Sequence, residues 1–294
     1  MTRRTARLGL NRTGYLYVLP VLIVVVGIVY LGVAYNGYVS LLDWSGIGDG
    51  QVFIGLENYV DAFADPVLWT ALGHVAVFAV ITITVQMLLG LTMAILLSGG
   101  VWLRGVYKVV MFLPVVLSPA VISVSFRNLL SPDGAVNAAL EAVGLGALTQ
   151  PWLANPDTAL FAIAAINIWA WTGFSFLLYQ AALSQISQEH IEAAQLDGAG
   201  RFRTMWSVVV PQLSGTHATL VLIGIIGSLK TFELVYLTTG GGPGRSTEFL
   251  TTYIYKKAIE GFDAGYAAAL SVILLVLSLA LTVIQMRVNR TLKG

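Results

Sequence analysis

Residues 189–211 read EHIEAAQLDGAGRFRTMWSVVVP, a polar stretch between two apolar segments at 159–183 and 213–237. It holds two glutamates, one aspartate and two arginines. A charged side chain at the middle of a bilayer costs about 2.5–3.5 kcal/mol even on a lenient scale. We therefore expect this stretch to connect two membrane spans from outside the hydrocarbon.

The order of residues within this stretch predicts two short helices lying at a membrane face. Residues 189–196 alternate polar side chains with a small-residue face, as a short helix does. Gly198 and Gly200 supply the permissive backbone that ends a helix and turns the chain. A second helical run begins near Arg201, and we expect Pro211 at the start of the next long helix, where a missing N–H costs nothing.

The composition indicates a membrane protein. Of the 294 residues, 57% are hydrophobic and 11% are charged, whereas soluble domains carry about 25% charged residues. A net charge of +1 gives no support to a nucleic-acid partner. The absence of cysteine excludes disulfides, thiolate catalysis and cysteine metal sites. The three histidines have no ligand spacing, so no metal site is predicted.

The chain begins with a basic tail, residues 1–14, and an apolar run follows from Tyr15 to Tyr35. About 20 apolar residues are enough to span hydrocarbon, and the run exceeds the core of a secretory signal, which is about 7–15 residues long. No A-x-A cleavage pattern follows it. These features predict an uncleaved first transmembrane helix at 15–39.

Further apolar runs predict an all-α polytopic fold with six transmembrane helices. The other five spans are expected at 68–97, 106–129, 159–183, 213–237 and 264–286. Pro114 and Pro119 predict a kink or an unwound segment within the third span, because each proline removes a helix hydrogen bond. The domain organisation is then a core transmembrane domain at 68–286 with the polar helices at 187–210 inside it.

The connections between these spans are polar. An outer loop at 40–67 contains GLENYVDAF (55–63), which we expect to form a short interfacial helix. A second polar loop is expected at 131–157, and a tail at 287–294 ends the chain.

Basic residues decide the expected orientation, because cytoplasmic loops carry an excess of Lys and Arg. Six spans place both termini on one side, and eleven of the 16 Lys and Arg residues lie there. These are Arg3, Arg4, Arg7, Arg12, Arg104, Lys108, Arg201, Arg203, Arg287, Arg290 and Lys293. The other five are Arg127, Lys230, Arg245, Lys256 and Lys257. We therefore expect both termini and the stretch 187–210 to face the cytoplasm.

Motifs for catalysis are not found. GGGPGRST (240–247) superficially suggests a phosphate-binding loop, but Arg245 replaces the required lysine and Thr239 replaces the first glycine. It also follows a membrane helix rather than a strand. No HExxH, EF-hand loop, paired-glutamate cluster or Ser-His-Asp order is present. The sequence therefore offers no constellation for an enzyme.

Glu192, Ala193 and Ala194, followed by Gly198 and by VVVP (208–211), resemble the EAA-x3-G-x9-I-x-L-P signature of one protein family. The family is that of the inner-membrane permease subunits of ATP-binding-cassette (ABC) importers. The spacing matches throughout, and valines replace the isoleucine and the leucine.

The resemblance extends over nearly the whole chain. GLENYVDAF, SLKTFELVYLTTGGGP (228–243) and TTYIYKKAIEGFDAGYAAALSVIL (251–274) resemble segments of the carbohydrate-uptake group. Within that group the chain is similar to the first permease subunit of maltose, lactose and glycerol-phosphate systems. It departs from the usual pattern at Ser187, where proline is common, at His74, where asparagine or threonine is common, and at Glu233, where aspartate is common.

The resemblance implies a multi-pass protein of the bacterial inner membrane that works with other chains. Coupling to two cytoplasmic ATPase subunits is expected at Glu192, Ala193, Ala194, Asp197, Gly198 and Pro211. ATP and Mg are expected in those subunits and no cofactor in this chain. A second permease subunit is expected to complete a heterodimer, and an extracytoplasmic solute-binding protein to face Gly241, Gly242 and Pro243. The remaining expected partners are a carbohydrate substrate and the lipid bilayer.

The substrate path is expected along polar and aromatic residues of the fourth and fifth spans, since ligand sites combine apolar and aromatic faces with a few polar groups. The candidates are Asn167, Trp171, Tyr179, Lys230, Glu233 and Tyr236. Lys230 and Glu233 are at i and i+3, so we expect them on one helix face where they can pair. A purely structural role for this pair, and for Trp169 and Trp171, stays open.

Two other functions stay open at this point. A secondary transporter or channel driven by an ion gradient commonly shows inverted repeats, and no internal repeat is visible. A membrane scaffold needs no polar groups in its fourth and fifth spans. The sequence does not identify which sugar, polyol or glycerol phosphate is carried.

Overall fold

The computed structural model describes residues 12–99 and 102–291 in two units. The first unit comprises the described residues up to Ala64 together with Lys257–Val272. The second comprises Asp65–Lys256 and the residues from Ile273 onward. The predictions made for the first eleven residues and for Lys293 lie outside the described residues.

The first unit contains the predicted first span. The segments α1 (Arg12–Val24), η1 (Val25–Tyr30) and α2 (Leu31–Val39) follow one another without a break. The helix Tyr17–Val39 is long and apolar enough to cross a membrane, and its 18-residue apolar stretch has no residue buried inside the protein. Helical structure is therefore present where the first span is predicted, at 15–39, and its place in a membrane stays a prediction.

A small hairpin follows, which the all-α prediction did not include. Strands β1 (Leu42–Asp43) and β2 (Val52–Phe53) pair antiparallel. The expected short helix is present as α3 (Glu57–Ala64). Its buried Asn58 donates hydrogen bonds to the carbonyl oxygens of Ser40 and Leu42, at 3.0 and 2.9 Å, and so holds the hairpin against the helix.

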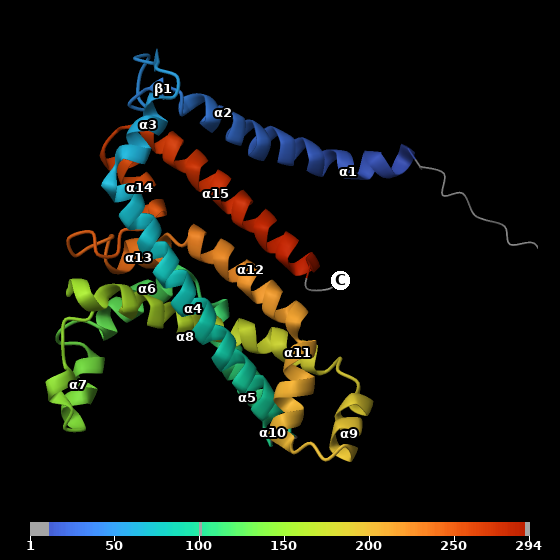
Figure 1. Ribbon diagram of the computed structural model, residues 1–294. Coiled ribbons are helices and arrows are strands. Elements are labelled where there is room, and N and C mark those ends of the chain that lie inside the picture. Colours follow the sequence, from blue (N-terminus) through green and yellow to red (C-terminus); the bar gives the residue numbers. More distant parts are fainter. Residues whose placement is uncertain (1–11, 100–101, 292–294) are drawn as a thin grey trace, which may run out of the picture. The chain divides into compact units, whose positions relative to one another are not determined.

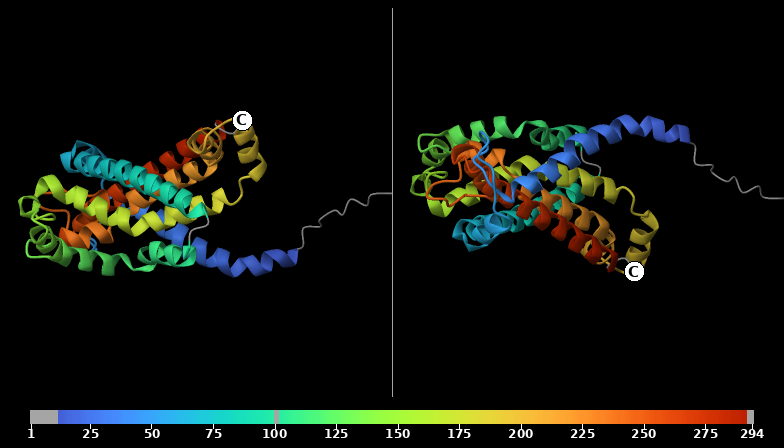
Figure 2. Two further views of the ribbon diagram at one scale, coloured as in Figure 1. Left: turned by 90° about the horizontal axis from the view of Figure 1, so that it is seen from below. Right: turned by 90° about the horizontal axis from the view of Figure 1, so that it is seen from above.

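Two long helices form the centre of the second unit. α4 (Pro66–Ser98) and α8 (Pro156–Leu183) lie side by side, as Figure 1 and Figure 2 show. Each begins with a proline in its first turn, after an Asp65 or Asn155 side chain that caps the helix. Long helices are therefore present where the second and fourth spans are predicted, with bounds that differ by up to three residues.

The third span is broken, as its prolines predict. α5 (Arg104–Val116) and α6 (Pro119–Leu129) are bent by 95° from each other. The break lies before Pro119, where Ser118 is extended and its Oγ accepts from the N–H of Val121 at 3.3 Å. This follows from the steric restriction that proline places on the preceding residue. Pro114 lies within α5 and does not end it.

The fifth span is not one helix, so the prediction for 213–237 is wrong. α12 (Ser214–Lys230) ends where Thr231 becomes extended, and α13 (Glu233–Thr238) begins after a two-residue interval. The carbonyl of Thr231 accepts a hydrogen bond from Oγ1 of Thr251 at 2.5 Å, in place of a helical partner. Lys230 and Glu233 therefore lie on different helices, and no ion pair joins them among the described residues.

The expected loops also contain helices. α7 (Ala135–Ala142) and the 3-10 turn η2 (Gly146–Leu148) lie in the predicted polar loop at 131–157. α14 (Leu250–Tyr255) continues into η4 (Lys256–Glu260) before α15 (Ala264–Thr291), which contains the sixth span. Within the described residues four helices can cross a membrane by length and composition, or six when each bent pair counts as one span.

Two apolar clusters form the core of the second unit. One cluster contains side chains of α4, α8, α12, α13 and the start of α14. Within it the rings of Phe78 and Phe249 meet edge to face, with their centroids 5.2 Å apart. The other joins the carboxyl-terminal halves of α4 and α8 to the turn around Leu213. Glycine permits the closest crossing: a Cβ at Gly173 of α8 would stand 1.9 Å from the carbonyl oxygen of Met111 on α5.

Candidate functional site

A cavity of about 560 Å³ lies between α4, α5, α6, α8, α12 and α13 of the second unit. Both helix breaks open onto it, because Leu117 and Pro119 line it from one break and Thr231 and Phe232 from the other. Broken helices that border a cavity are typical of substrate sites in membrane transporters, since irregular backbone is tolerated there.

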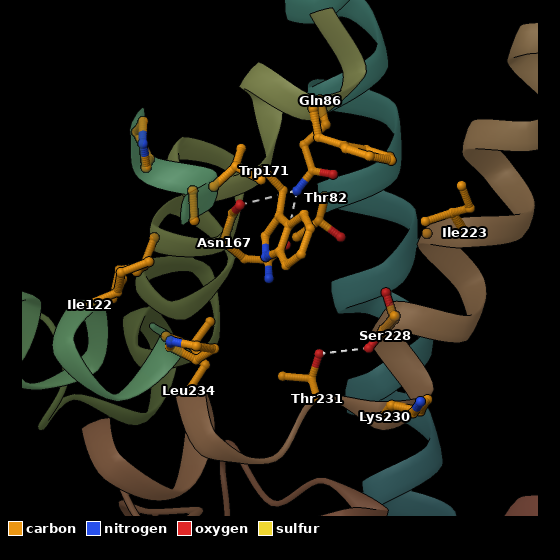
Figure 3. Close-up of a pocket in the computed structure, with 18 of the residues that line it drawn as sticks. Thr82, Gln86, Ile122, Asn167, Trp171, Ile223, Ser228, Lys230, Thr231 and Leu234 are labelled. Atoms are coloured by element: carbon orange, nitrogen blue, oxygen red, sulfur yellow. Dashed lines mark hydrogen bonds between the residues drawn. The ribbon is translucent and has the colours of Figure 1, made fainter. Parts of the chain in front are cut away.

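An amide pair forms one wall of this cavity. Nε2 of Gln86 on α4 donates to the side-chain Oδ1 of Asn167 on α8 at 2.9 Å and to its backbone oxygen at 3.1 Å. Figure 3 shows Gln86, Asn167 and Trp171 together at this wall. The hydroxyl of nearby Thr82 donates its hydrogen bond within α4, to the carbonyl of Phe78 at 2.8 Å.

Aromatic and charged residues complete the lining. Trp171 is 43% exposed and meets Phe174 edge to face, with ring centroids 6.2 Å apart. Lys230 and Glu233 line the cavity from the two sides of the α12 to α13 break. The cavity therefore offers an aromatic face, amide groups and one charge of each sign.

Four of the six predicted path residues line this cavity, namely Asn167, Trp171, Lys230 and Glu233. Tyr179 does not, because it is fully buried and its hydroxyl lies 2.7 Å from Nδ1 of His217. Tyr236 does not line it either, and its ring stacks on that of Phe232 with the ring centroids 5.2 Å apart. The role of all six in transport stays a prediction.

Sequence reasoning missed Gln86. A single glutamine in the apolar run of the second span was the available signal, since an intramembrane polar group is costly and so usually has a partner.

The predicted pair of short helices is present in the polar stretch. α9 (Gln188–Leu196) is capped by Ser187, whose Oγ accepts from the N–H of Glu189 at 3.3 Å. Gly198 has a φ of +80°, a conformation that favours glycine. The chain then runs through α10 (Arg201–Thr204), η3 (Met205–Val209) and α11 (Val210–Gln212).

The position predicted for Pro211 is wrong. It lies in α11, and the next long helix begins only at Ser214, after a 62° bend. The buried side chain of Leu213, 1% exposed, anchors this bend in the apolar cluster of α4 and α8. The bend at Leu213, rather than the proline, therefore separates the polar stretch from α12.

The stretch presents an open surface. α9 has no buried residue, and Glu192, Ala193 and Asp197 are exposed. Two large apolar side chains are also exposed nearby, Leu196 at 89% and Phe202 at 78%. α9 and α7 lie at opposite ends of the second unit in every view of Figure 1 and Figure 2.

A buried carboxylate lies next to the glycine-rich loop. Glu248, 1% exposed, accepts from Nζ of Lys256 and from Oγ1 of Thr252, both at 2.6 Å. A Cβ at Gly241 would stand 2.8 Å from this carboxylate. Gly242 and Pro243 line a shallow groove of about 420 Å³ beside the connection from α6 to α7.

No group of three or more His, Cys, Asp or Glu side chains in the described parts of the chain is placed to hold a metal ion.

These features define a class of protein, a polytopic membrane protein with a helix-enclosed cavity and an exposed polar connection. The family model of the binding-protein-dependent transport system inner membrane component matches residues 86–294, so the chain belongs to this family of ABC-importer permeases. The resemblance given by the EAA signature is confirmed.

Relatives match over almost their whole length. "Probable ABC transporter permease protein YurN" of Bacillus subtilis is 36% identical over 281 residues, which cover 94% of this chain and 96% of the relative. The trehalose/maltose transport system permease protein MalF of Thermococcus litoralis is 30% identical over 281 residues, 95% of this chain and 94% of the relative.

A solved structure shares the fold. A chain in the crystal structure of a bacterial ABC transporter involved in the import of the acidic polysaccharide alginate superposes with a TM-score of 0.82. Its sequence identity is 22%, and 96% of each chain is covered.

Proposed function

We propose that this ABC-importer permease takes up a sugar or a related polyol and forms half of its translocation path. The observation that carries the proposal is the cavity where two broken helices, the Gln86 and Asn167 amides and the face of Trp171 come together. Amides and aromatic faces are the groups that a polyhydroxylated ligand uses, since each hydroxyl both donates and accepts hydrogen bonds. The trehalose/maltose permease named above supports the same substrate class.

The polar stretch 187–210 couples this path to ATPase subunits. Its open surface at Glu192 and Ala193, next to the half-buried Ala194, allows close approach of a partner, and the carboxylates of Glu192 and Asp197 can accept charge-assisted hydrogen bonds. Gly198 orients α9 relative to α10, and Pro211 lies at the far end of the stretch. ATP and Mg are bound by the two ATPase subunits, and this chain itself carries no cofactor and no catalytic residue.

The chain crosses the bacterial cytoplasmic membrane several times, with both termini in the cytoplasm. The excess of Lys and Arg on the side of the stretch 187–210 supports this orientation. The opposite end of the second unit, with α7 and the loop Gly241–Pro243, then faces the solute-binding protein. A second permease subunit forms the other half of the path.

The experiment is uptake of labelled maltose, trehalose, lactose and glycerol by proteoliposomes that hold this chain with its second permease, ATPase pair and binding protein. We expect ATP-dependent uptake of at least one of them. Joint replacement of Asn167, Trp171 and Glu233 by alanine should abolish it while the complex still assembles. Uptake of none of the four, or uptake unchanged by the triple replacement, contradicts the proposal.

A further inference from the structure

Hydrogen-bond geometry fixes which way the two amides of the cavity wall point. The backbone oxygen of Asn167 can only accept, so the group of Gln86 that lies 3.1 Å from it must be the NH2. The second hydrogen of that NH2 is donated to Oδ1 of Asn167 at 2.9 Å. Both N–H groups of the Gln86 amide therefore donate to Asn167.

Two groups of the pair are left over. Nδ2 of Asn167, with two N–H donors, and Oε1 of Gln86, an acceptor, have no hydrogen-bond partner among the described residues. Both side chains are half-buried and line the cavity. The wall therefore presents a donor from α8 next to an acceptor from α4, which matches a hydroxyl group that accepts from one and donates to the other.

We propose that Gln86 is a positioning residue that holds Nδ2 of Asn167 toward the substrate, and that the amide pair recognises one hydroxyl of a polyhydroxylated ligand. This inference rests on the proposed function, since it names the contact by which that same cavity selects its ligand. Without the two donors of Gln86, Asn167 is free to rotate its amide by 180° and to present an acceptor instead.

Two neighbouring hydroxyls already donate their proton to a backbone carbonyl. The hydroxyl of Thr82, one turn away on α4, donates to the carbonyl of Phe78. The hydroxyl of Thr231 donates to the carbonyl of Gly227 at 2.9 Å. Both groups are already bonded within their own helices, so their removal leaves the amide pair unchanged.

The test measures binding to the assembled complex in nanodiscs without the binding protein, by saturation-transfer NMR. The probe is whichever of maltose, trehalose, lactose and glycerol the wild-type complex takes up, together with its monodeoxy analogues. Gln86→Met removes both donors with little change in size, Gln86→Glu keeps the acceptors alone, and Asn167→Asp removes the cavity donor from the other helix. Thr92→Val is the matched control, because Thr92 is on the same helix but does not line the cavity, and its hydroxyl donates to the carbonyl of Leu88 at 2.7 Å.

We expect the Kd of the probe to rise about tenfold or more in the three amide variants, because a buried hydrogen-bonding group loses its partner. One monodeoxy analogue, which lacks the recognised hydroxyl, should bind the wild type as weakly as the probe binds Gln86→Met. Gln86→Met should bind the probe and this analogue with the same Kd. Thr92→Val should stay within about twofold, as for substitutions away from such contacts.

The inference is overturned if the wild type takes up the probe but Gln86→Met and Asn167→Asp keep the wild-type Kd and the wild-type preference for the probe over its deoxy analogue. That result leaves the proposed function standing. If the Gln86 variants fail to assemble, the Kd and the deoxy preference of Asn167→Asp decide between the two outcomes. A wild-type complex that takes up or binds none of the probes overturns both proposals.

Discussion

The hydroxyl of Tyr179 on α8 lies 2.7 Å from Nδ1 of His217 on α12, and this hydrogen bond joins the two helices on either side of the polar stretch 187–210. A weaker contact of 3.4 Å between Nδ1 of His190 and Oε1 of Gln212 links α9 to α11, between these two helices. Helices tied on both sides of a connection transmit its displacement as a rigid body.

Replacing Tyr179 by phenylalanine should therefore weaken coupling more than folding. Loss of the hydroxyl costs about 0.5–1.5 kcal/mol of stability, the net value of one hydrogen bond. The number of ATP molecules hydrolysed per sugar transported should rise, because α8 and α12 no longer move together. Tyr30→Phe, at a tyrosine 64% exposed, is the control. An unchanged ATP-to-sugar ratio in Tyr179→Phe contradicts this coupling role.

Gly198→Val should abolish uptake while the chain still inserts into the membrane. The φ of +80° costs a residue with a side chain about 1–2 kcal/mol, and relief of this strain reorients α9. Gly200→Ala is the matched control, because its φ is −66° and an added Cβ meets nothing within 4 Å. Normal transport by Gly198→Val and by the charge reversal Glu192→Lys excludes the coupling role of the stretch.

Lys256→Met should lower the thermal stability of the complex. Glu248 loses its ion pair while it stays buried, which costs roughly 1–3 kcal/mol. The double variant with Glu248→Gln should recover most of the loss, since the uncompensated charge is gone. The exposed Glu260→Gln serves as control and should change stability by less than about 0.5 kcal/mol. Thermal unfolding of purified variants is the measurement, and equal stability of Lys256→Met and the wild type rules the effect out.

Gly173→Ala should destabilise the packing of α5 on α8. The new Cβ would stand 1.9 Å from the carbonyl oxygen of Met111, so the two helices must separate, and such overpacking costs about 1–3 kcal/mol. Gly73→Ala on α4, where a Cβ meets nothing within 4 Å, should be neutral or stabilising. The amount of folded chain retained in detergent on heating measures both, and a Gly173→Ala variant as heat-resistant as Gly73→Ala refutes the close crossing.

The positions of the long helices follow from the sequence, because about 20 apolar residues can lie in hydrocarbon only as a helix. The break at Pro119 is also visible, since a proline restricts the residue before it. The break at Thr231 is not, because the hydrogen bond that stabilises it comes from Thr251, twenty residues away. Hydropathy cannot register such a contact.

The sequence likewise indicates some of the cavity residues and not others. Asn167 and Trp171 stand out as polar and aromatic residues in an apolar span, and both line it. Gln86 is marked only as a single glutamine in an apolar span, and the sequence does not show its pairing with Asn167, which is 81 residues away. Tyr179 carries the same sequence signal as the lining residues, but the packing of α8 turns it toward His217.

The energy source of uptake tests the central claim most directly. Proteoliposomes with the assembled complex are given the sugar and its binding protein, with and without ATP at the side of the stretch 187–210, and with ionophores that remove ion gradients. The account predicts uptake that requires ATP, is lost in Gly198→Val and is unaffected by ionophores. Uptake that continues without ATP and collapses when the ion gradient is removed would contradict it, and would identify a secondary transporter.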